Sequence, residues 1–594
     1  LRLAGWEADS GELSYPKGVR PQKGKNLAIA EWPTKSGPAD YVLFVGLQPV
    51  GVVEAKRKSK DVSATLEQAK RYSRGYTVTR DQLAPGGPWD QYKVPFLFAT
   101  NGRPFLRQLQ TKSGIWFLDG RRPENLSRPL ESWYTPDGLV AMLKQDIDKA
   151  HEQLKTEPTE YLGLRDYQLK AIRFVEGAIE KGQRECLVAM ATGTGKTRTC
   201  IGLTYRLLKT RRFRRVLFLV DRSALGVQTA NAYKDARLEN LQTFVDIFDM
   251  KELGDIKPDS DTKLQIATIQ GMVKRILFPR TESEIPPVDQ YDCIVIDECH
   301  RGYLLDRELG DAEFQFRDES DYISKYRRVL DHFDAVKIGL TATPALHTTE
   351  IFGRPVYQYS YREAVIDGNL IDHEPPVQIV TKLAEDGMHW KTGEEMTLYN
   401  TRAQTLDTVI LPDEVNLDID SYNSRVVTEK FNQVVCTELA QHIDPSLEGK
   451  TIIFCATDSH ADLVVRLLKQ VLAAKYDGVE DDAVLKITGA ADKPLELIRR
   501  FKNERNPSIA VTVDLLTTGI DVPAICNIVF LRRVRSRILY EQMLGRATRR
   551  CDEIGKEVFR IFDAVDLYAA LESVSTMRPV VADPKISLDR KSVV

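Results

Sequence analysis

A glycine-rich segment near residue 190 restricts the folds open to this chain more than any other part of it. The nine residues AMATGTGKT, 189–197, follow a short apolar run that predicts a buried strand, and a helical pattern begins directly after them. Glycines in such a turn let backbone N–H groups approach phosphate oxygens, and the positive end of the following helix attracts the same anion. The segment therefore predicts a phosphate-binding loop between a strand and a helix.

The other residues of this loop have the chemistry that a nucleotide site needs. Lys196 is a mobile cation that can reach a phosphate, and the hydroxyl of Thr197 can hold Mg²⁺. The expected phosphate cradle is Thr192, Gly193, Thr194 and Gly195. Met190 stands where the usual G-x-x-x-x-G-K-[ST] pattern begins with glycine, so an ordinary glycine turn is the alternative interpretation.

The hydrophobic pattern divides the 594 residues into three blocks, and it contains no run of eighteen apolar residues that could span a membrane. The first block alternates short strands with one helical segment, 62–74, and a connector with an expected helix over 138–154 follows. Two further blocks repeat strand, turn and helix, with strands that are apolar throughout, as in parallel sheets covered on both faces. The expected boundaries are 1–120, 121–160, 161–370 and 371–570, with a tail over 571–594.

Two carboxylates follow an apolar run about a hundred residues after the loop. Asp297 and Glu298 come directly after the expected strand 293–296, and open parallel sheets bind ligands at the carboxyl ends of their strands. We expect Asp297 to reach the metal and Glu298 to activate the attacking water, although such a pair can also be a solvated strand end. Upstream, Gln168 could read the adenine edge through a bidentate amide contact, or only begin an amphipathic helix.

The third block ends in a segment with two arginines three residues apart. Arg546 and Arg549 are expected to share one face of a predicted helix, where they could neutralise charge on a transferred phosphoryl group. Gly519 and Asp521 follow an expected strand, 509–513, and could form a loop that couples the nucleotide to a second ligand. A basic helix is usually a solvated face, so this interpretation depends on the phosphate-binding loop.

In this order the motifs resemble those of helicase superfamily 2, over about residues 164–563. The resemblance implies two RecA-like, doubly wound parallel-sheet domains that bind ATP and track along nucleic acid. It also implies an adenine-reading glutamine and two arginines that act as fingers on the nucleotide. The residues that match the motifs are Gln168, 192–197, Asp297, Glu298 and His300, Thr341 and Thr343, Gly519 and Asp521, and Gln542, Arg546 and Arg549.

A second set of acidic and basic residues lies in the first block. Asp40 stands at the start of one apolar strand, and Glu54 and Lys56 close the next strand after a hairpin turn. Side chains alternate along a strand, so Glu54 and Lys56 share a face on which Asp40 and Glu54 could bind Mg²⁺ and Lys56 could orient water. Any hairpin with polar ends can show this spacing. Gln68 and Tyr72 share one face of the expected helix, and their alternative role is to pack it on the sheet.

This constellation resembles the PD-(D/E)xK nucleases that carry a Q-x-x-x-Y element, with Ala39 in the position before the acid. A nuclease of this kind ahead of a superfamily 2 motor is similar to the restriction, or motor, subunit of type I restriction-modification enzymes. The resemblance implies a restriction-endonuclease-like α/β domain followed by two RecA-like domains, an ATP-dependent translocase and endonuclease of double-stranded DNA, and ATP and Mg²⁺ as cofactors. It implies modification (methyltransferase) and specificity subunits as partners in a prokaryotic cytoplasm, and a helical region beyond residue 594.

Composition limits the remaining alternatives. The formal net charge is −2, so contacts with DNA would depend on local basic clusters at 56–60, 211–215 and 532–537. The eight scattered cysteines and eight histidines predict reduced thiols in a cytosol and no zinc site. Two other functions stay open: a repair or RNA helicase whose first domain only binds nucleic acid, and a scaffold with a degenerate nucleotide site.

Overall fold

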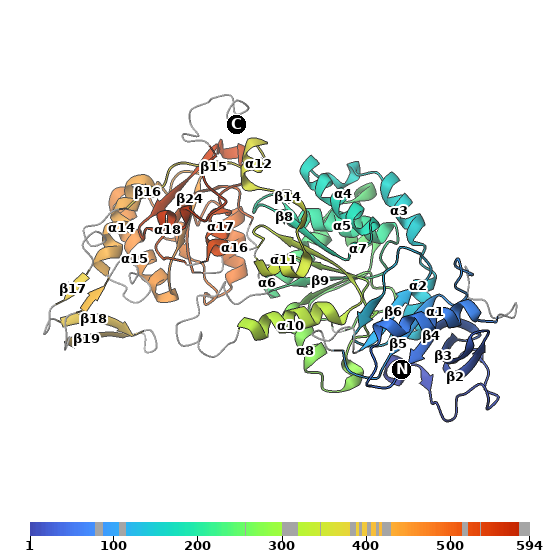
Figure 1. The fold of residues 1–594 in the computed structure, drawn as a ribbon. Coiled ribbons are helices and arrows are strands. Elements are labelled where there is room, and N and C mark those ends of the chain that lie inside the picture. Colours follow the sequence, from blue (N-terminus) through green and yellow to red (C-terminus); the bar gives the residue numbers. More distant parts are fainter. Residues whose placement is uncertain are drawn as a thin grey trace. The chain divides into compact units, whose positions relative to one another are not determined.

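The computed structural model contains three seven-stranded sheets and two short two-stranded ones within the residues that it describes (Figure 1). The chain divides into two compact units: residues 1–188, 197–304 and 311–358 form the first, and residues 189–196, 305–310 and 359–594 form the second. The structure describes residues 1–77, 87–105, 114–221, 223–255, 257–299, 319–344, 346–379, 388–390, 395–400, 405–410, 415–417, 429–513, 521–534 and 536–580.

The first sheet keeps its strands in sequence order. Its strands are β1 (Glu7–Ala8), β2 (Asn26–Thr34), β3 (Gly37–Val45), β4 (Gln48–Ala55), β5 (Phe96–Thr100), β6 (Ile115–Asp119) and β7 (Arg128–Leu130). β2, β3 and β4 pair antiparallel, whereas β4 and β5 pair parallel. A parallel pair needs a crossover, and α1 (Leu66–Gly75), which follows a 3₁₀ turn at Ser63–Thr65, lies in it. The expected α/β first domain is confirmed.

The connector differs from its prediction in two respects. β7 pairs with β6, so the first sheet continues into the segment that the sequence assigns to the connector. The single helix expected over 138–154 is wrong, because two helices, α2 (Pro136–Leu143) and α3 (Ile147–Thr156), occupy this region. The carboxylate of Asp146 accepts the N–H of Lys149 and caps the second helix, which separates it from the first. The domain boundaries themselves stay a prediction.

The second sheet has the order β10-β11-β9-β12-β13-β8-β14, and its central pairings are parallel. Its strands are β8 (Glu185–Met190), β9 (Val216–Val220), β10 (Met250–Lys251), β11 (Leu264–Thr268), β12 (Cys293–Ile296), β13 (Val336–Thr341) and β14 (Pro355–Tyr359). Its helices are α4 (Asp166–Glu180), α5 (Lys196–Lys209), α6 (Ser223–Asp235), α7 (Phe244–Ile247), α8 (Ile269–Leu277), α10 (Glu319–His332) and α11 (Leu346–Phe352). β9 and β12 are buried along their whole length, as expected of strands covered on both faces.

The third sheet has the order β15-β25-β24-β21-β23-β22, with β16 beside β25, and its pairings are parallel. Its strands are β15 (Asp372–His373), β16 (Val377–Gln378), β21 (Lys450–Phe454), β22 (Val484–Lys486), β23 (Ile509–Thr512), β24 (Ile525–Phe530) and β25 (Val558–Asp563). Its helices are α12 (Tyr361–Ile366), α14 (Glu429–His442), α15 (Asp458–Lys475), α16 (Pro494–Asn503), α17 (Arg537–Leu544) and α18 (Leu567–Glu572). The prediction of two doubly wound parallel sheets is confirmed.

Four short strands between α12 and α14 were not anticipated from the sequence. β17 (Met388–Trp390) pairs antiparallel with β20 (Val415–Leu417), and β18 (Glu395–Asn400) pairs antiparallel with β19 (Thr405–Ile410). They form the two small two-stranded sheets. They are therefore an addition to the parallel sheet rather than part of it.

A buried group of charges joins the first domain to the second sheet. Asp334, which precedes β13, accepts hydrogen bonds from Arg128 of β7 and from Arg184, which precedes β8, both at 2.6 Å. The hydroxyl of Tyr134 donates to the same carboxylate, whose side chain is only 3% exposed. Burial opposes ionisation of Asp334, but the two guanidinium groups outweigh it and lower the pKa of the carboxyl. We call these four residues the Asp334 joint.

A second contact lies next to this joint. The hydroxyl of Thr135, the N-cap of α2, donates to Asp289 at 2.5 Å, and the backbone N–H of Thr135 donates to the same carboxylate. Val288 packs in one apolar cluster with Trp6 and Leu139. The first domain and the second sheet therefore share a packed core as well as the ionic joint.

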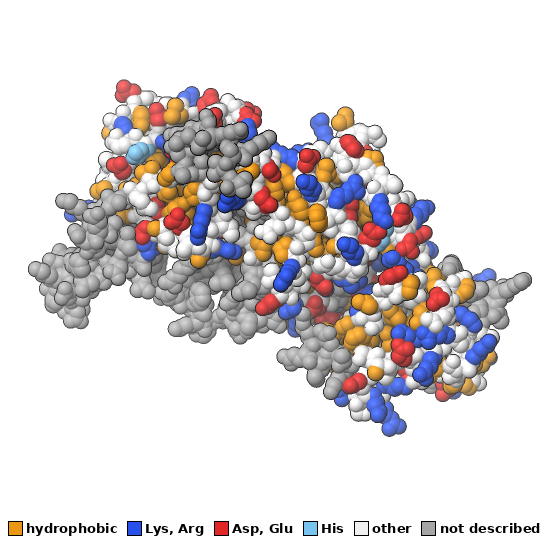
Figure 2. Space-filling model, turned by 45° about the horizontal axis from the view of Figure 1, so that its top comes forward, with side chains coloured by type: hydrophobic (Ala, Val, Ile, Leu, Met, Phe, Trp, Pro, Cys, Tyr) orange, Lys and Arg blue, Asp and Glu red, His pale blue; other side chains and the backbone are white. Residues whose placement is uncertain are grey.

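The described surface carries side chains of both charges (Figure 2). On the face shown in Figure 2, Lys and Arg side chains are interspersed with Asp and Glu over the described residues. All eight cysteines carry free thiols. Among the described residues there is no helix with the length and apolar character needed to cross a bilayer.

Candidate active sites

The hairpin of β3 and β4 brings the two predicted acids of the first domain together. Tyr41 pairs with Val53, and continuing the antiparallel register by one residue sets Asp40 opposite Glu54. Side chains of directly opposed residues lie on the same face, with Cβ atoms about 5 Å apart. Oδ2 of Asp40 also accepts the backbone N–H of Ala55 at 2.7 Å, which fixes the carboxylate at the end of β4. The acids therefore stand side by side at one end of the sheet.

Glu54 is a buried carboxylate that its surroundings only partly satisfy. The residue is 1% exposed, and Lys56 forms an ion pair with its Oε1. Oε2 is buried and has no hydrogen-bond partner among the described residues. Burial raises the pKa of Glu54, Lys56 opposes the shift, and the neighbouring charge of Asp40 adds to it. A cation at this carboxylate would relieve both the burial cost and the repulsion between the acids.

Gln68 and Tyr72 hold Lys56 in place. Nζ of Lys56 donates to Oε1 of Gln68 at 3.1 Å, and Nε2 of Gln68 donates to the hydroxyl of Tyr72 at 2.7 Å. Tyr72 is also buried in the apolar cluster between α1 and the sheet, so the packing role expected as the alternative is present as well. The hydrogen bond with Glu54 raises the pKa of Lys56, so the ammonium form is favoured. We call Glu54, Lys56, Gln68 and Tyr72 the lysine chain.

The donor set at this site suits Mg²⁺. Asp40 and Glu54 offer hard carboxylate oxygens, and one of these oxygens, Oε2 of Glu54, is buried without a partner among the described residues. The part of the chain that the structure describes contains no cluster of three or more His, Cys, Asp or Glu side chains arranged for a metal. Mg²⁺ commonly uses one or two carboxylates and completes its shell with water and phosphate oxygens, so two acids are sufficient.

The phosphate-binding loop follows β8 as the sequence predicts. Gly193 and Gly195 adopt φ values of 90° and 78°, which side chains with a Cβ rarely tolerate, and α5 begins at Lys196. Nζ of Lys196 lies 3.5 Å from the carbonyl oxygen of Met190, so its side chain folds back along the loop. The hydroxyl of Thr194 donates to the carbonyl of Ala191 at 2.6 Å and closes the turn. Thr192 precedes the glycines, and Thr197 lies in the first turn of α5.

The acidic motif lies at the end of a strand near β8. β12 and β8 flank β13, and the N–H of Lys337 in β13 bonds to the carbonyl of Arg184 before β8, so these strands start side by side. Asp297 and Glu298 directly follow β12, and Oδ1 of Asp297 accepts the N–H of Glu298 at 2.9 Å. Glu298 has a φ of 50°, a left-handed conformation that non-glycine residues adopt mainly where function or packing requires it.

The motif with Thr341 and Thr343 lies at the end of β13, the strand between these two. Thr341 ends β13, and its hydroxyl accepts the N–H of Thr343 at 3.1 Å. Both threonines are buried. The three motifs of the second sheet therefore follow three neighbouring strands, whereas His300 lies outside the described residues.

Gln168 lies at the start of α4, as in the alternative interpretation of this residue. It occupies the third position of α4, where its Oε1 accepts the backbone N–H of Arg165 at 2.9 Å as part of a capping box. The residue is 4% exposed. An amide oxygen has two lone pairs, so this cap is compatible with a contact to adenine, and the adenine-reading role of Gln168 stays a prediction.

The helix expected around the two arginines of the third block is wrong. α17 ends at Leu544, and Arg546 and Arg549 lie in the turn and bend that follow. Arg546 is buried, with its Nε donating to the carbonyl of Gln542 at 3.1 Å. Arg549 forms an ion pair with Asp521, so the structure joins two motifs that the sequence treats separately. Gly519 lies outside the described residues.

Several arginines of the basic clusters outside the first domain have partners within the protein. Arg214 pairs with Asp292 at 3.2 Å, and Arg215 donates to the carbonyls of Thr262 and Asp259. In the cluster 532–537, Arg533 donates to the carbonyl of Val565, and Arg532 is buried. Arg214, Arg215 and Arg533 thus have partners within the protein, and DNA binding at these two clusters stays a prediction.

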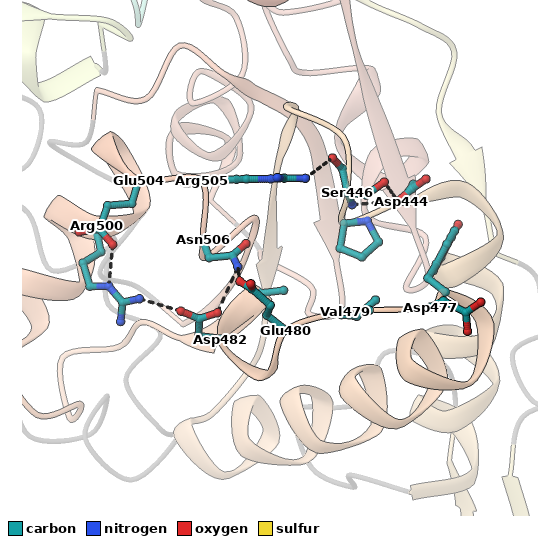
Figure 3. Close-up of a pocket in the computed structure, with 14 residues that line it drawn as sticks. Asp444, Ser446, Asp477, Val479, Glu480, Asp482, Arg500, Glu504, Arg505 and Asn506 are labelled. Atoms are coloured by element: carbon teal, nitrogen blue, oxygen red, sulfur yellow. Dashed lines mark hydrogen bonds and ion pairs between the residues drawn. The ribbon is translucent and has the colours of Figure 1, made fainter.

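A polar pocket of about 440 Å³ lies in the second unit, away from the predicted residues (Figure 3). Its walls come from segments that precede β21, β22 and β23, such as Asp444 and Glu504, whereas nucleotide motifs follow strands. Arg500 pairs with Asp482 and Glu504, and Asn506 donates to Asp482. The polar groups thus largely satisfy one another, and the pocket contains none of the predicted site residues.

Asn101 is a buried polar residue near the nuclease-like site that the sequence analysis did not single out. Asn101 directly follows β5 and is 3% exposed, and its side chain bonds to the backbone of two loops. The dipeptide Asn101-Gly102 is typical of a turn, and this is the signal that the sequence offers. The contacts with a distant loop require the folded sheet.

Three family models match consecutive parts of the chain. Residues 7–143 match the second domain of the type I restriction enzyme EcoKI endonuclease subunit. Residues 161–346 match the res subunit of type III restriction enzymes, and residues 431–551 match the conserved C-terminal domain of helicases. The models therefore cover most of the first domain and parts of the second and third sheets.

Individual proteins align with nearly the whole chain. The EcoKI endonuclease subunit of Escherichia coli K12 is 50% identical over 99% of this chain and 53% of its own length. The EcoAI endonuclease subunit of Escherichia coli is 29% identical over 93% of this chain and 64% of its own length. The fragment structure of an HsdR subunit from Vibrio vulnificus YJ016 is 24% identical, with a TM-score of 0.48 over 91% of this chain and 86% of that one. The chain spans about half the length of the EcoKI subunit.

Proposed function

Because the chain belongs to the family of type I restriction enzyme endonuclease subunits, we propose that it is an ATP-driven translocase of double-stranded DNA that also cuts DNA. Cleavage would fall on unmodified DNA away from the recognition site. The observation that carries the proposal is the lysine chain beside Asp40, in the same polypeptide as a phosphate-binding loop. The chain spans 53% of the EcoKI subunit, so the activity of the whole protein is part of the proposal.

The first domain would perform the phosphodiester hydrolysis. Asp40 and Glu54 would hold Mg²⁺, which when bound supplies Lewis-acid stabilisation of charge on the phosphate. Lys56 would act as a cation rather than as a base, because its raised pKa keeps it protonated at neutral pH. Gln68 and Tyr72 would position Lys56 through their hydrogen bonds rather than touch the substrate.

The parallel sheets would perform ATP hydrolysis. Gly193 and Gly195 open the loop for phosphate oxygens, and Lys196 and the N-terminus of α5 supply positive charge there. Asp297 and Thr197 would hold the Mg²⁺ that accompanies ATP and screens its phosphate charge. Glu298 would orient and deprotonate the attacking water. The arginines after α17, Arg546 and Arg549, would stabilise the charge of the transferred phosphoryl group.

The partners would follow from the family. Double-stranded DNA would be the substrate and track, and separate modification (methyltransferase) and specificity subunits would supply target recognition. The alternative, a superfamily 2 repair helicase without nuclease activity, leaves the ordered lysine chain around a buried carboxylate without a role.

Two variants of the full chain in its assembled complex test the proposal. Lys196→Ala should abolish ATP turnover, whereas Asp40→Ala should abolish DNA cleavage and keep ATP turnover near that of the parent. Loss of both activities in Asp40→Ala would contradict two separate sites. A strand-displacement assay adds a second check, because robust unwinding without cleavage would favour the repair helicase.

A further inference from the structure

The loop after the lysine chain carries a group of exposed cations. Arg57, Lys58 and Lys60 follow Lys56 directly, and all three side chains are exposed. No ion pair of theirs with an acid occurs among the described residues. We call residues 57–60 the basic turn. Exposed cations usually only keep a protein soluble. A binding role is therefore supported only if the backbone of this turn is held in one position.

The protein fixes the basic turn at both ends. At its start, the N–H of Lys56 donates to the carbonyl of Thr100 in β5 at 2.8 Å. At its end, Nδ2 of Asn101 donates to the carbonyl of Lys60 at 2.9 Å, and the N–H of Lys60 bonds to the carbonyl of Arg57 at 3.0 Å. Val62, just beyond the turn, is fully buried in the core. The backbone of the turn is therefore tied to the sheet on either side of the cations.

The buried amide of Asn101 serves this arrangement. Its Oδ1 accepts the N–H of Arg103 at 3.1 Å, while its Nδ2 holds the carbonyl of Lys60. A buried amide needs such partners, and here both are backbone groups of loops at the edge that carries the acids. A run of cations that only improved solubility would need no buried anchor.

We propose that the basic turn binds phosphates of the DNA backbone next to the bond that is cut, and that Asn101 is the positioning residue that holds the turn in place. The inference rests on the proposed nuclease function. Lys56 belongs to the lysine chain, so the next residues stand beside the same carboxylates. Ammonium and guanidinium groups recognise phosphate without reading sequence, which suits an enzyme that cuts at variable positions. Fixing them beforehand lowers the entropic cost of binding.

The experiment measures cleavage of unmodified duplex DNA by the assembled complex at several salt concentrations. The test variant is Arg57→Gln/Lys58→Gln/Lys60→Gln, and the control is Lys17→Gln/Lys23→Gln/Lys25→Gln. The control changes the charge equally at exposed lysines of the same domain. Lys25 lies at the far end of the hairpin from Asp40, because its carbonyl accepts the N–H of Gly46 in the β3–β4 turn.

We expect the test variant to cut at least about tenfold more slowly than the control at low salt. Its plot of log rate against log salt should be shallower by about 2 to 3 units, because each phosphate that is no longer neutralised removes about 0.9 from the slope. Asn101→Ala keeps every cation, and should lower the rate with a smaller change in slope. Thermal unfolding of each variant shows whether the domain stays folded. A test variant with the rate and slope of the control would overturn the inference.

The outcomes separate this inference from the proposed function. If Asp40→Ala does not cut and the test variant cuts like the control, only the basic turn is wrongly assigned. If Asp40→Ala cuts like the parent, the proposed nuclease site itself is wrong. If Asn101→Ala matches the parent in rate at every salt concentration, the positioning role of Asn101 is wrong.

Discussion

The nuclease-like site and the nucleotide motifs are built differently. In the first domain, Asp40, the end of β4 and one face of α1 lie within residues 40–72, and Lys56, Gln68 and Tyr72 bond to one another through their side chains. In the parallel sheets, the motif residues are spread from Gln168 to Arg549 and sit on separate helices, strand ends and turns. Several of them bond to nearby backbone, as Lys196 and Asp297 do.

The difference shows two ways of preparing a site. The nuclease-like site is ordered by side chains that hold other side chains, so removing one positioning residue should disturb its neighbours. The nucleotide motifs are ordered by the separate strands and helices that carry them, so each residue should be removable with little effect on the others. The following predictions test this contrast.

The largest effect is expected at Glu298. Glu298→Gln removes the proposed base and should lower ATP turnover by about 100- to 10,000-fold, because general base catalysis contributes about this much. Thermal unfolding should change little, since the substitution keeps size and polarity. Steady-state ATP hydrolysis with DNA measures the effect, and near-normal turnover would remove Glu298 from its proposed role.

The next effect is expected at Gln68, which is proposed to act only through Lys56. Gln68→Ala should lower DNA cleavage by about 10- to 100-fold, the usual range for partners that orient a metal-site residue. Its effect should not add to that of Lys56→Ala, because both changes break one chain. Lys70→Ala on the same helix removes a bond to Glu67 and serves as the control. Additive losses would mean that Gln68 acts independently.

Without metal, the burial of charged Glu54 should lower the stability of the first domain. Burial raises the pKa of Glu54 above its ordinary value of 4.5, so folding favours the neutral carboxyl. The contribution of Glu54 to the stability of the fold is therefore present below pH 4.5 and is lost as the pH rises through the raised pKa. Glu54→Gln should therefore raise the unfolding midpoint at pH 8 in chelator. Mg²⁺ at a hundred times its dissociation constant should stabilise the parent by about 2.7 kcal/mol, and the variant less. Equal stabilisation of both would exclude Glu54 as a ligand.

The smallest effect is expected at Asp521. The side chains of Asp521 and Arg549 are 59% and 25% exposed, and exposed pairs contribute only about 0 to 1 kcal/mol. Asp521→Asn should therefore leave the unfolding midpoint almost unchanged. A loss of several degrees would show that side-chain contacts also order the nucleotide motifs, and the contrast between the two sites would fail.

Local spacing made the first site predictable from sequence. A hairpin places Asp40 across from Glu54, and a four-residue interval places Gln68 beside Tyr72. The strands of the parallel sheets could also be predicted from the sequence, because buried parallel strands are short apolar runs. The end of α17 could not be predicted, because the residues after Gly545 keep a helical composition although the chain turns there. The contacts of Arg214 and Arg215 could not be predicted either, because their partners lie in loops distant in sequence.

The Asp334 joint has a consequence for anyone who divides the gene. A boundary placed between the first domain and the motor would put Arg128 and Tyr134 on one product and Asp334 with Arg184 on the other. One fragment would then expose Arg128 without its carboxylate partner. The other would expose Asp334 with only one of its two arginine partners, Arg184. Each would also present the apolar patch around Trp6 or Val288 to water. The first domain and the second sheet are better expressed as one polypeptide.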